Sequence, residues 1–289
     1  MRVLCRRFCI AGVFAVVFAT AVSADVTLRL VQHLSAGLLG MDSRVTWYQK
    51  GDKFAEYEEA ELALVSIKNA KIYDFKKKKV WEVDFDEETY KELDWDSVMN
   101  SSDIGSAIKN EMAATFSLLE PEFFHFEIFP IDYTWDIAGY KTKGVSANVI
   151  TRFNNPFTSS GINGNFVFNF WMSRIIDKND PIKKIVDFRN QNFGDSERLS
   201  GITFTDIWQG VDTVEIKNKI VHAVQKACGD TSHLYPLGIE IVMETGDPLN
   251  VASSVNMIYF SQFVVSVSEN RIPDDIFEIP EGFTLAEEE

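Results

Sequence analysis

Apolar and polar residues alternate along Lys68–Leu93, and this alternation predicts consecutive antiparallel strands. The apolar positions flank four consecutive lysines and recur at every second residue, at Tyr73, Phe75, Trp81, Val83 and Phe85. A period of two residues is typical of strands that bury one face and expose the other. We therefore expect two or three strands here, joined by tight turns.

Strand-like patterns recur along most of the chain. They cover Val26–His33, Arg44–Tyr48, Lys53–Glu61, Glu122–Phe129, Asp132–Ile137, Val145–Phe153, Phe166–Trp171, Leu237–Met243 and Ser253–Val267. The segments Ser35–Asp42 and Asn154–Asn165 each contain two glycines and are expected to form turns or loops. The glutamates of Lys53–Glu61 favour a position near a sheet edge, where charge discourages aggregation.

Three segments show helical patterns instead. Apolar residues recur at intervals of three or four after Trp95, at Ile104, Ile108, Met112, Phe116 and Leu119. A second helix is expected to begin at Asp180-Pro181 and to run to about Asn192, and a third covers Thr213–Cys228 and stops at Gly229. The first helix is expected to lie on the sheet, either as a fixed part of the core or as a movable lid.

The order of these elements predicts the α+β class, with a large antiparallel sheet and about three helices that occur in blocks. Helices do not alternate with strands, as they would in a parallel sheet. No segment is rich enough in Gly, Ser or Pro to separate domains. We therefore expect a single domain over 25–289, with a helical insert at about 175–235.

The N-terminus predicts a secretory signal peptide over 1–24. Arg2, Arg6 and Arg7 precede an apolar run from Phe8 to about Val22, and small residues lead to a cleavage site after Ala24. The alternative is an N-terminal anchor, but the run is shorter than the roughly 20 residues that a membrane span needs. We expect export to the periplasm, or alternatively to the extracellular space.

Cleavage changes the charge and cysteine content. Loss of three arginines takes the formal charge from −15 to −18, which disfavours nucleic acid and anionic lipid surfaces as partners. Cys228 alone remains, so no internal disulfide can form. No later segment is long and apolar enough to span a membrane, so we expect a soluble mature protein.

Sequence motifs do not favour catalysis, a cofactor or a metal. The four histidines, at positions 33, 125, 222 and 233, form no metal-ligand spacing with one another or with cysteine. The acidic alternation of Asp84, Asp86 and Glu88 lacks the glycine and the closing glutamate of a calcium loop. We expect a protein that is not an enzyme; the alternative is a hydrolase with a Ser or Asp beside a His.

Aromatic content is the feature that most exceeds expectation, with 23 Phe, 6 Trp and 8 Tyr. An aromatic sheet face beneath an amphipathic helix can hold an acyl chain, at about 0.8 kcal/mol per buried methylene. The expected lining of such an apolar cavity is Trp81, Val83, Phe85, Ile104, Ile108, Met112, Phe116, Phe166, Phe168 and Phe170. The same pattern is expected if these side chains only fill a large core.

Several segments, taken in order, resemble the half-barrel family of LolA, LolB and LppX. They are Lys50–Lys53, Ile72–Phe75, Val80–Asp84, Glu88–Tyr90, Ile137–Lys141, Phe170–Ser173 and Ile276–Phe283. The resemblance implies an unclosed antiparallel barrel with helices in its mouth, and a role in carrying or sensing lipids or acylated proteins in the envelope. No position matches the arginine with which LolA closes its lid, so lipoprotein transfer itself is not implied.

The expected function is therefore an exported, non-enzymatic carrier of a lipid, an acyl chain or another apolar ligand. The alternative is a structural or interaction module of the envelope with a filled core and a protein partner.

Overall fold

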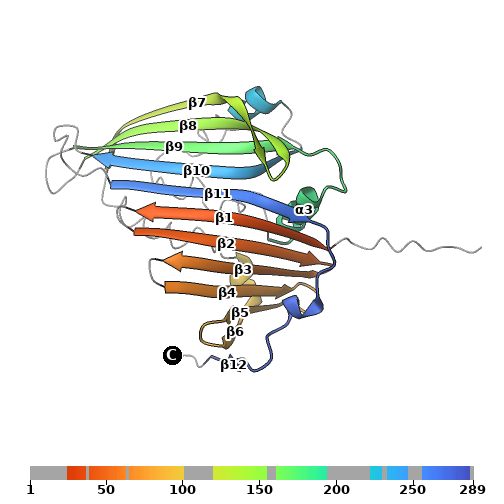
Figure 1. Cartoon of the computed structure of the whole chain (residues 1–289). Helices are drawn as coiled ribbons and strands as arrows, with labels where there is room; N and C mark the ends of the chain where they lie inside the picture. Colours follow the sequence, from red (N-terminus) through yellow and green to blue (C-terminus); the bar gives the residue numbers. More distant parts are fainter. Residues whose placement is uncertain are drawn as a thin grey trace, which may run out of the picture.

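A computed structural model of the chain is organised around one twelve-stranded sheet (Figure 1). The structure describes residues 25–36, 39–62, 65–100, 120–154, 161–193, 222–229, 233–246 and 256–286. The strand order is β12-β6-β5-β4-β3-β2-β1-β11-β10-β9-β8-β7, and the first and last strands in this order do not pair. The sheet is therefore large and unclosed. Few helices accompany it in the described residues, as the sequence predicts for an α+β protein.

The strands form two antiparallel meanders that meet at the middle of the sheet. The first comprises β1 (Val26–Ala36), β2 (Leu39–Lys50), β3 (Lys53–Leu62), β4 (Val65–Asp74), β5 (Lys79–Asp84) and β6 (Thr89–Leu93). The second comprises β7 (Glu120–Ile137), β8 (Tyr140–Asn154), β9 (Gly161–Arg174), β10 (Leu234–Gly246) and β11 (Asn256–Ser268). β1 pairs with β11 and joins the two meanders, and the short β12 (Thr284–Leu285) adds to β6 in parallel.

The helical residues lie between strands. They form α1 (Trp95–Asn100), α3 (Pro181–Phe193), the 3-10 helix η2 (Asp274–Phe277) and residues 222–228. The predicted cap of α3 is confirmed, because Asp180 Oδ1 accepts a hydrogen bond from Ile182 N at 2.9 Å. None of the described helices has the length and apolar character to cross a membrane.

The register divides the sheet into two faces. The face on which α3 packs is called the helix face; its core includes Leu28, Trp47, Phe54, Val80 and the α3 residue Ile185. Phe188 and Phe193 of α3 pack against Phe54 and Phe75, with ring centroids 5.3–6.2 Å apart and all contacts edge-on except the stacked Phe54–Phe188 pair. Because side chains alternate between the two faces along each strand, every second residue of each strand points to the helix face.

The opposite face of β3–β6 is covered by residues 272–283 and is called the tail face. Ile272 and Phe277 pack there against Ala55, Ile72 and Val83. The Tyr57 hydroxyl donates to Ile276 O at 2.9 Å, and burial raises the pKa of Tyr57 to about 12. The C-terminal segment is therefore an integral layer of the fold and extends past η2 to β12 (Figure 1).

One lysine ties this segment to the start of the described chain. Lys50 Nζ donates to Ile272 O at 2.6 Å and pairs with Asp274 at 2.9 Å. Asp25, the first described residue, accepts a hydrogen bond from Ile272 N at 2.8 Å. Lys50 and Asp25 thus join the start of the described chain to the first residues of the C-terminal segment.

Several predicted boundaries are wrong, although the strands themselves are confirmed. Ser35–Asp42 was expected as a turn, but β1 and β2 extend to Ala36 and from Leu39. Glu122–Phe129 and Asp132–Ile137 form a single strand, β7, because the chain absorbs the break after Pro130 as a bulge between Ile131 and Thr134. β9 begins at Gly161, inside the segment expected as loop.

Candidate functional site

The candidate site is the part of the helix face formed by β8, β9 and β10. Phe168 pairs with Ala147 of β8 and Ile241 of β10, while Phe166 pairs with Val149 and Phe170 with Val145. All these side chains share the face of Gln262 and Leu30 on the neighbouring strands, and hence that of α3. We call this set the apolar floor: Val145, Ala147, Val149, Phe166, Phe168, Phe170, Ile239 and Ile241.

The apolar floor is buried but separate from the two described core clusters. Phe166 and Phe168 are 0% and 1% exposed, and Ala147 is 1% exposed. Among the described residues, neither the cluster around α3 nor the cluster under the C-terminal segment includes them. These side chains are therefore withdrawn from water, like the members of the two clusters.

A row of polar side chains crosses the same face beside the floor. Ser43 Oγ donates to Gln32 Oε1 at 3.0 Å, and Gln32 Nε2 donates to Gln262 Oε1 at 2.9 Å. Gln262 pairs across the strands with Ile239, which belongs to the floor. Glu58 is also hydrogen-bonded to Ser43 and extends the row to β3. Polar side chains thus lie beside the floor on this face, between the apolar residues Phe260, Val264 and Leu30 of β11 and β1.

Glu58 is the titratable member of this row. Burial raises the pKa of its carboxyl group, and the neighbouring Glu56 raises it further, while the Ser43 hydrogen bond and Lys71 oppose the rise. Ser43 has one hydroxyl hydrogen, which it cannot give to Gln32 and Glu58 at once. Protonated Glu58 can instead donate to Ser43 Oγ, so that both hydrogen bonds form together.

We expect Glu58→Gln to stabilise the protein at pH 7.5 and to have little effect at pH 4.5. The folded pKa is raised, so the contribution of Glu58 to stability is fully present below its unfolded pKa and is lost as pH rises. Glutamine keeps the neutral, donating form at every pH. Thermal melts at the two pH values measure the change, expected as a rise of a few °C at pH 7.5 only, of the order that about 1 kcal/mol gives.

Glu59→Gln is the matched control for this prediction. Glu59 points to the opposite face, where its hydrogen bond with Lys68 lowers the pKa of its carboxyl group. Its contribution to stability is present at neutral pH and is lost on acidification, so its removal should cost up to about 1 kcal/mol at pH 7.5. Equal effects of the two substitutions would contradict the assignment of Glu58.

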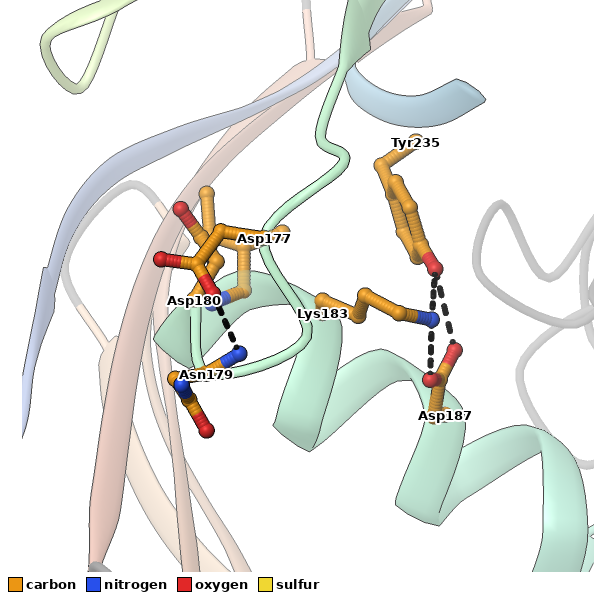
Figure 2. A network of polar contacts seen from close by, with 7 residues as sticks. Asp177, Asn179, Asp180, Lys183, Asp187 and Tyr235 are labelled. Carbon is orange, nitrogen blue, oxygen red and sulfur yellow. Dashed lines mark hydrogen bonds and ion pairs between the residues drawn. The ribbon is translucent and has the colours of Figure 1, made fainter. Parts of the chain in front are cut away.

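Helix α3 is held on the sheet by a partly exposed ion pair and a tyrosine. Figure 2 shows Lys183 Nζ reaching Asp187 Oδ2 at 2.5 Å and Tyr235 Oη at 2.7 Å, while Tyr235 Oη donates to Asp187 Oδ1 at 3.1 Å. The bond to Asp187 raises the pKa of Lys183, and burial raises the pKa of Tyr235. At the helix start, the Tyr140 hydroxyl donates to Asp180 at 3.0 Å.

Arg189 of α3 makes polar contacts with side chains of the sheet. Its guanidinium lies 3.8 Å from the ring centroid of Trp47, and it reaches Glu56 at 4.0 Å. A guanidinium stacked on indole gains a cation–π attraction that strengthens as the site loses water. Lys183, Asp187 and Arg189 therefore orient α3 beside the polar row and hold it there.

The predicted cavity residues do not all lie together. Phe166, Phe168 and Phe170 lie on the helix face, as just described. Trp81 and Val83 lie on the tail face, and Phe85 packs beside them against Phe283 at 5.6 Å between ring centroids. One cavity cannot be lined by both sets, because the sheet separates them. Ile104, Ile108, Met112 and Phe116 lie outside the described residues.

The polar row was not predicted from the sequence, although the pattern contains a signal for it. Gln32 continues the inward series Val26, Leu28 and Leu30, and Ser43 precedes Val45 and Trp47 in theirs. A polar residue at an inward position must find buried partners. A search for polar residues at the inward positions of otherwise apolar strands would have identified both residues.

Two acid–histidine pairs lie on the other face of the sheet in the described residues, His33–Asp42 and His125–Glu127. His33 Nδ1 lies 2.6 Å from Asp42 Oδ1, and Ser261 is the cross-strand neighbour of His33. The His33 and Asp42 side chains are 40% and 75% exposed, so the pair lies on an open surface. Within the described part of the chain, no three His, Cys, Asp or Glu residues are placed to hold a metal ion.

A scan against protein-family models and a search of curated proteins found no match to this chain.

Proposed function

We propose that the protein is an exported, non-enzymatic carrier that binds an amphiphile, such as a fatty acid or lipid, on the helix face of its sheet. The observation that carries the proposal is the apolar floor directly beside the polar row. An acyl chain on Phe166, Phe168 and Ile241 would bring its polar end to Gln262 and Gln32. The resemblance of the sequence segments to the LolA-like half-barrel family supports the same proposal.

The energetics favour a ligand with a long chain. Each buried methylene contributes about 0.8 kcal/mol, so ten methylenes would offset most of the cost of association. The polar row would then set the orientation of the ligand and would not dominate its affinity.

The second candidate is a structural or interaction module in which the same side chains only fill a core. The burial of Phe166 and Phe168 favours this alternative, since both are already withdrawn from water. The two proposals differ in what an added side chain on the floor would meet. In a carrier it would enter space meant for the ligand, whereas in a filled core it would meet packed atoms.

Ala147→Phe separates the two proposals. In a carrier, we expect this substitution to weaken the binding of a fluorescent fatty acid by at least tenfold and to change stability by less than about 1 kcal/mol. In a filled core, overpacking should cost about 1–3 kcal/mol. Fluorescence titration and chemical denaturation of the same samples give the two readouts.

Ala55→Phe is the control, because Ala55 is equally buried but lies in the packed cluster under the C-terminal segment. It should cost about 1–3 kcal/mol and leave the affinity for the fatty acid unchanged. Wild-type protein that does not bind the probe, or an Ala147→Phe variant that binds as well as wild type, would contradict the carrier proposal.

A further inference from the structure

The two edges of the sheet differ in whether another strand segment covers their backbone. At one edge, the backbone of β6 is covered by β12, with Thr284 N donating to Glu88 O and Ala286 N to Tyr90 O. At the other edge, β7 is the terminal strand of the sheet in the described residues and pairs with β8 alone. An edge strand presents a row of backbone donors and acceptors that can pair with another strand.

One stretch of β7 lacks the usual protection of such an edge. Exposed edges are commonly guarded by lysines, prolines and bulges. β7 contains no Lys or Arg, and its two prolines and two bulges flank residues 123–129, at Pro121–Phe123 on one side and at Pro130–Thr134 on the other. Residues 123–129 therefore form a stretch of the edge with no proline, lysine or arginine.

The charges on this edge are complementary to a second copy of themselves. His125 and Glu127 lie on one face of β7, with Nε2 and Oε1 3.0 Å apart, and their side chains are 48% and 59% exposed. When two such strands pair antiparallel about a two-fold axis at Phe126, residue 125 of each lies opposite residue 127 of the other. Each histidine then faces a glutamate, and the arrangement occurs twice in the dimer.

We propose that β7 pairs with β7 of a second copy of this chain, antiparallel and centred on Phe126, and so continues the sheet across a homodimer. The pairing spans residues 123–129, between the two bulges, and places Phe129 opposite Phe123. It ends at the bulge, where Pro130 has no N–H to donate. Cross-strand pairs of opposite charge stabilise a sheet, and like charges directly opposite destabilise it.

Charge substitutions with a mixing step test this register. We expect the purified wild-type chain to sediment as a dimer at micromolar concentration. Glu127→Lys places lysine opposite histidine, and His125→Glu places glutamate opposite glutamate, so each variant alone should weaken the dimer by about tenfold. An equimolar mixture of the two variants should restore dimerisation, because every opposed pair in the mixed dimer is again complementary.

The mixing step excludes an effect within one strand, because mixing cannot change contacts inside a monomer. Glu59→Lys makes a similar change at an exposed cross-strand pair in the interior of the sheet, 2.9 Å from Lys68, and should leave the dimer intact. Wild-type protein that is monomeric throughout the concentration range would overturn the proposal. Single variants that dimerise like wild type, or a mixture that stays monomeric, would also overturn it. The proposal does not depend on ligand binding, so either can fail alone.

Discussion

Phe277→Ala is expected to lower the free energy of unfolding by about 3–5 kcal/mol, one of the two largest losses that we predict. Phe277 is 3% exposed and packs with Ile272 against Ala55, Ala70, Ile72 and Val83. Alanine would leave a cavity between the C-terminal segment and the tail face. The loss corresponds to a decrease in Tm of roughly 10 °C for a chain of this size.

Phe283→Ala is the matched control in the same segment. Phe283 is half-buried and makes an edge contact with Phe85, with ring centroids 5.6 Å apart. Its truncation should cost about 1 kcal/mol, since less surface is removed from the core. Denaturant titrations that give equal losses for the two variants would show that the C-terminal segment is not an integral layer of the fold.

Trp171→Ala is expected to be equally costly, at about 3–5 kcal/mol. The indole is 1% exposed and lies over two backbone positions without side chains, Gly144 and Gly238. Trp135 from the end of β7 packs edge-on against it at 5.2 Å, and Tyr133 lies at 5.4 Å. The tryptophan therefore joins β8, β9 and β10 to the returning end of β7.

A double-mutant cycle tests whether the contact with Trp171 is the reason for a glycine at position 144. A Cβ at Gly144 would lie 2.6 Å from Ile131 Cδ1 and 2.7 Å from Trp171 Cζ3, so Gly144→Ala should cost about 1–3 kcal/mol. Part of that cost should disappear in the Trp171→Ala background, because one of the two clashes is removed. Gly40→Ala is the control, since nothing lies within 4 Å of its added Cβ. Additive losses would contradict the proposed contact.

The alternation of apolar and polar residues predicted where the strands lie better than it predicted what covers each of their faces. Along Lys68–Leu93 it located β4, β5 and β6 and grouped Trp81 with Val83. It could not say which face the pair occupies, because both faces of β4 and β5 are covered, one by α3 and the other by residues 272–283. The structure places residues 272–283 on their side of the sheet, and the helix that was expected to cover them lies outside the described residues.

The acidic strand β3 shows a second limit. Its glutamates favoured an edge position, yet β3 lies between β2 and β4 in the interior of the sheet. Its charges are balanced by partners distant in sequence: Lys68 pairs with Glu59, and Arg189 lies near Glu56. Local composition contains no information about such partners. The placement of Phe166, Phe168 and Phe170 on one face depends only on their spacing along the strand and was predicted correctly.

The most direct test of the central claim is native mass spectrometry of the protein purified without detergent from its own envelope fraction. We expect a chain that begins at Asp25 and carries one non-covalent adduct with the mass of a fatty acid or lipid. Organic extraction should release that adduct and leave the bare chain, and added fatty acid should bind again with one-to-one stoichiometry. A bare mass in the native spectrum, with no uptake of added fatty acid, would contradict the proposal that the helix face binds an amphiphile.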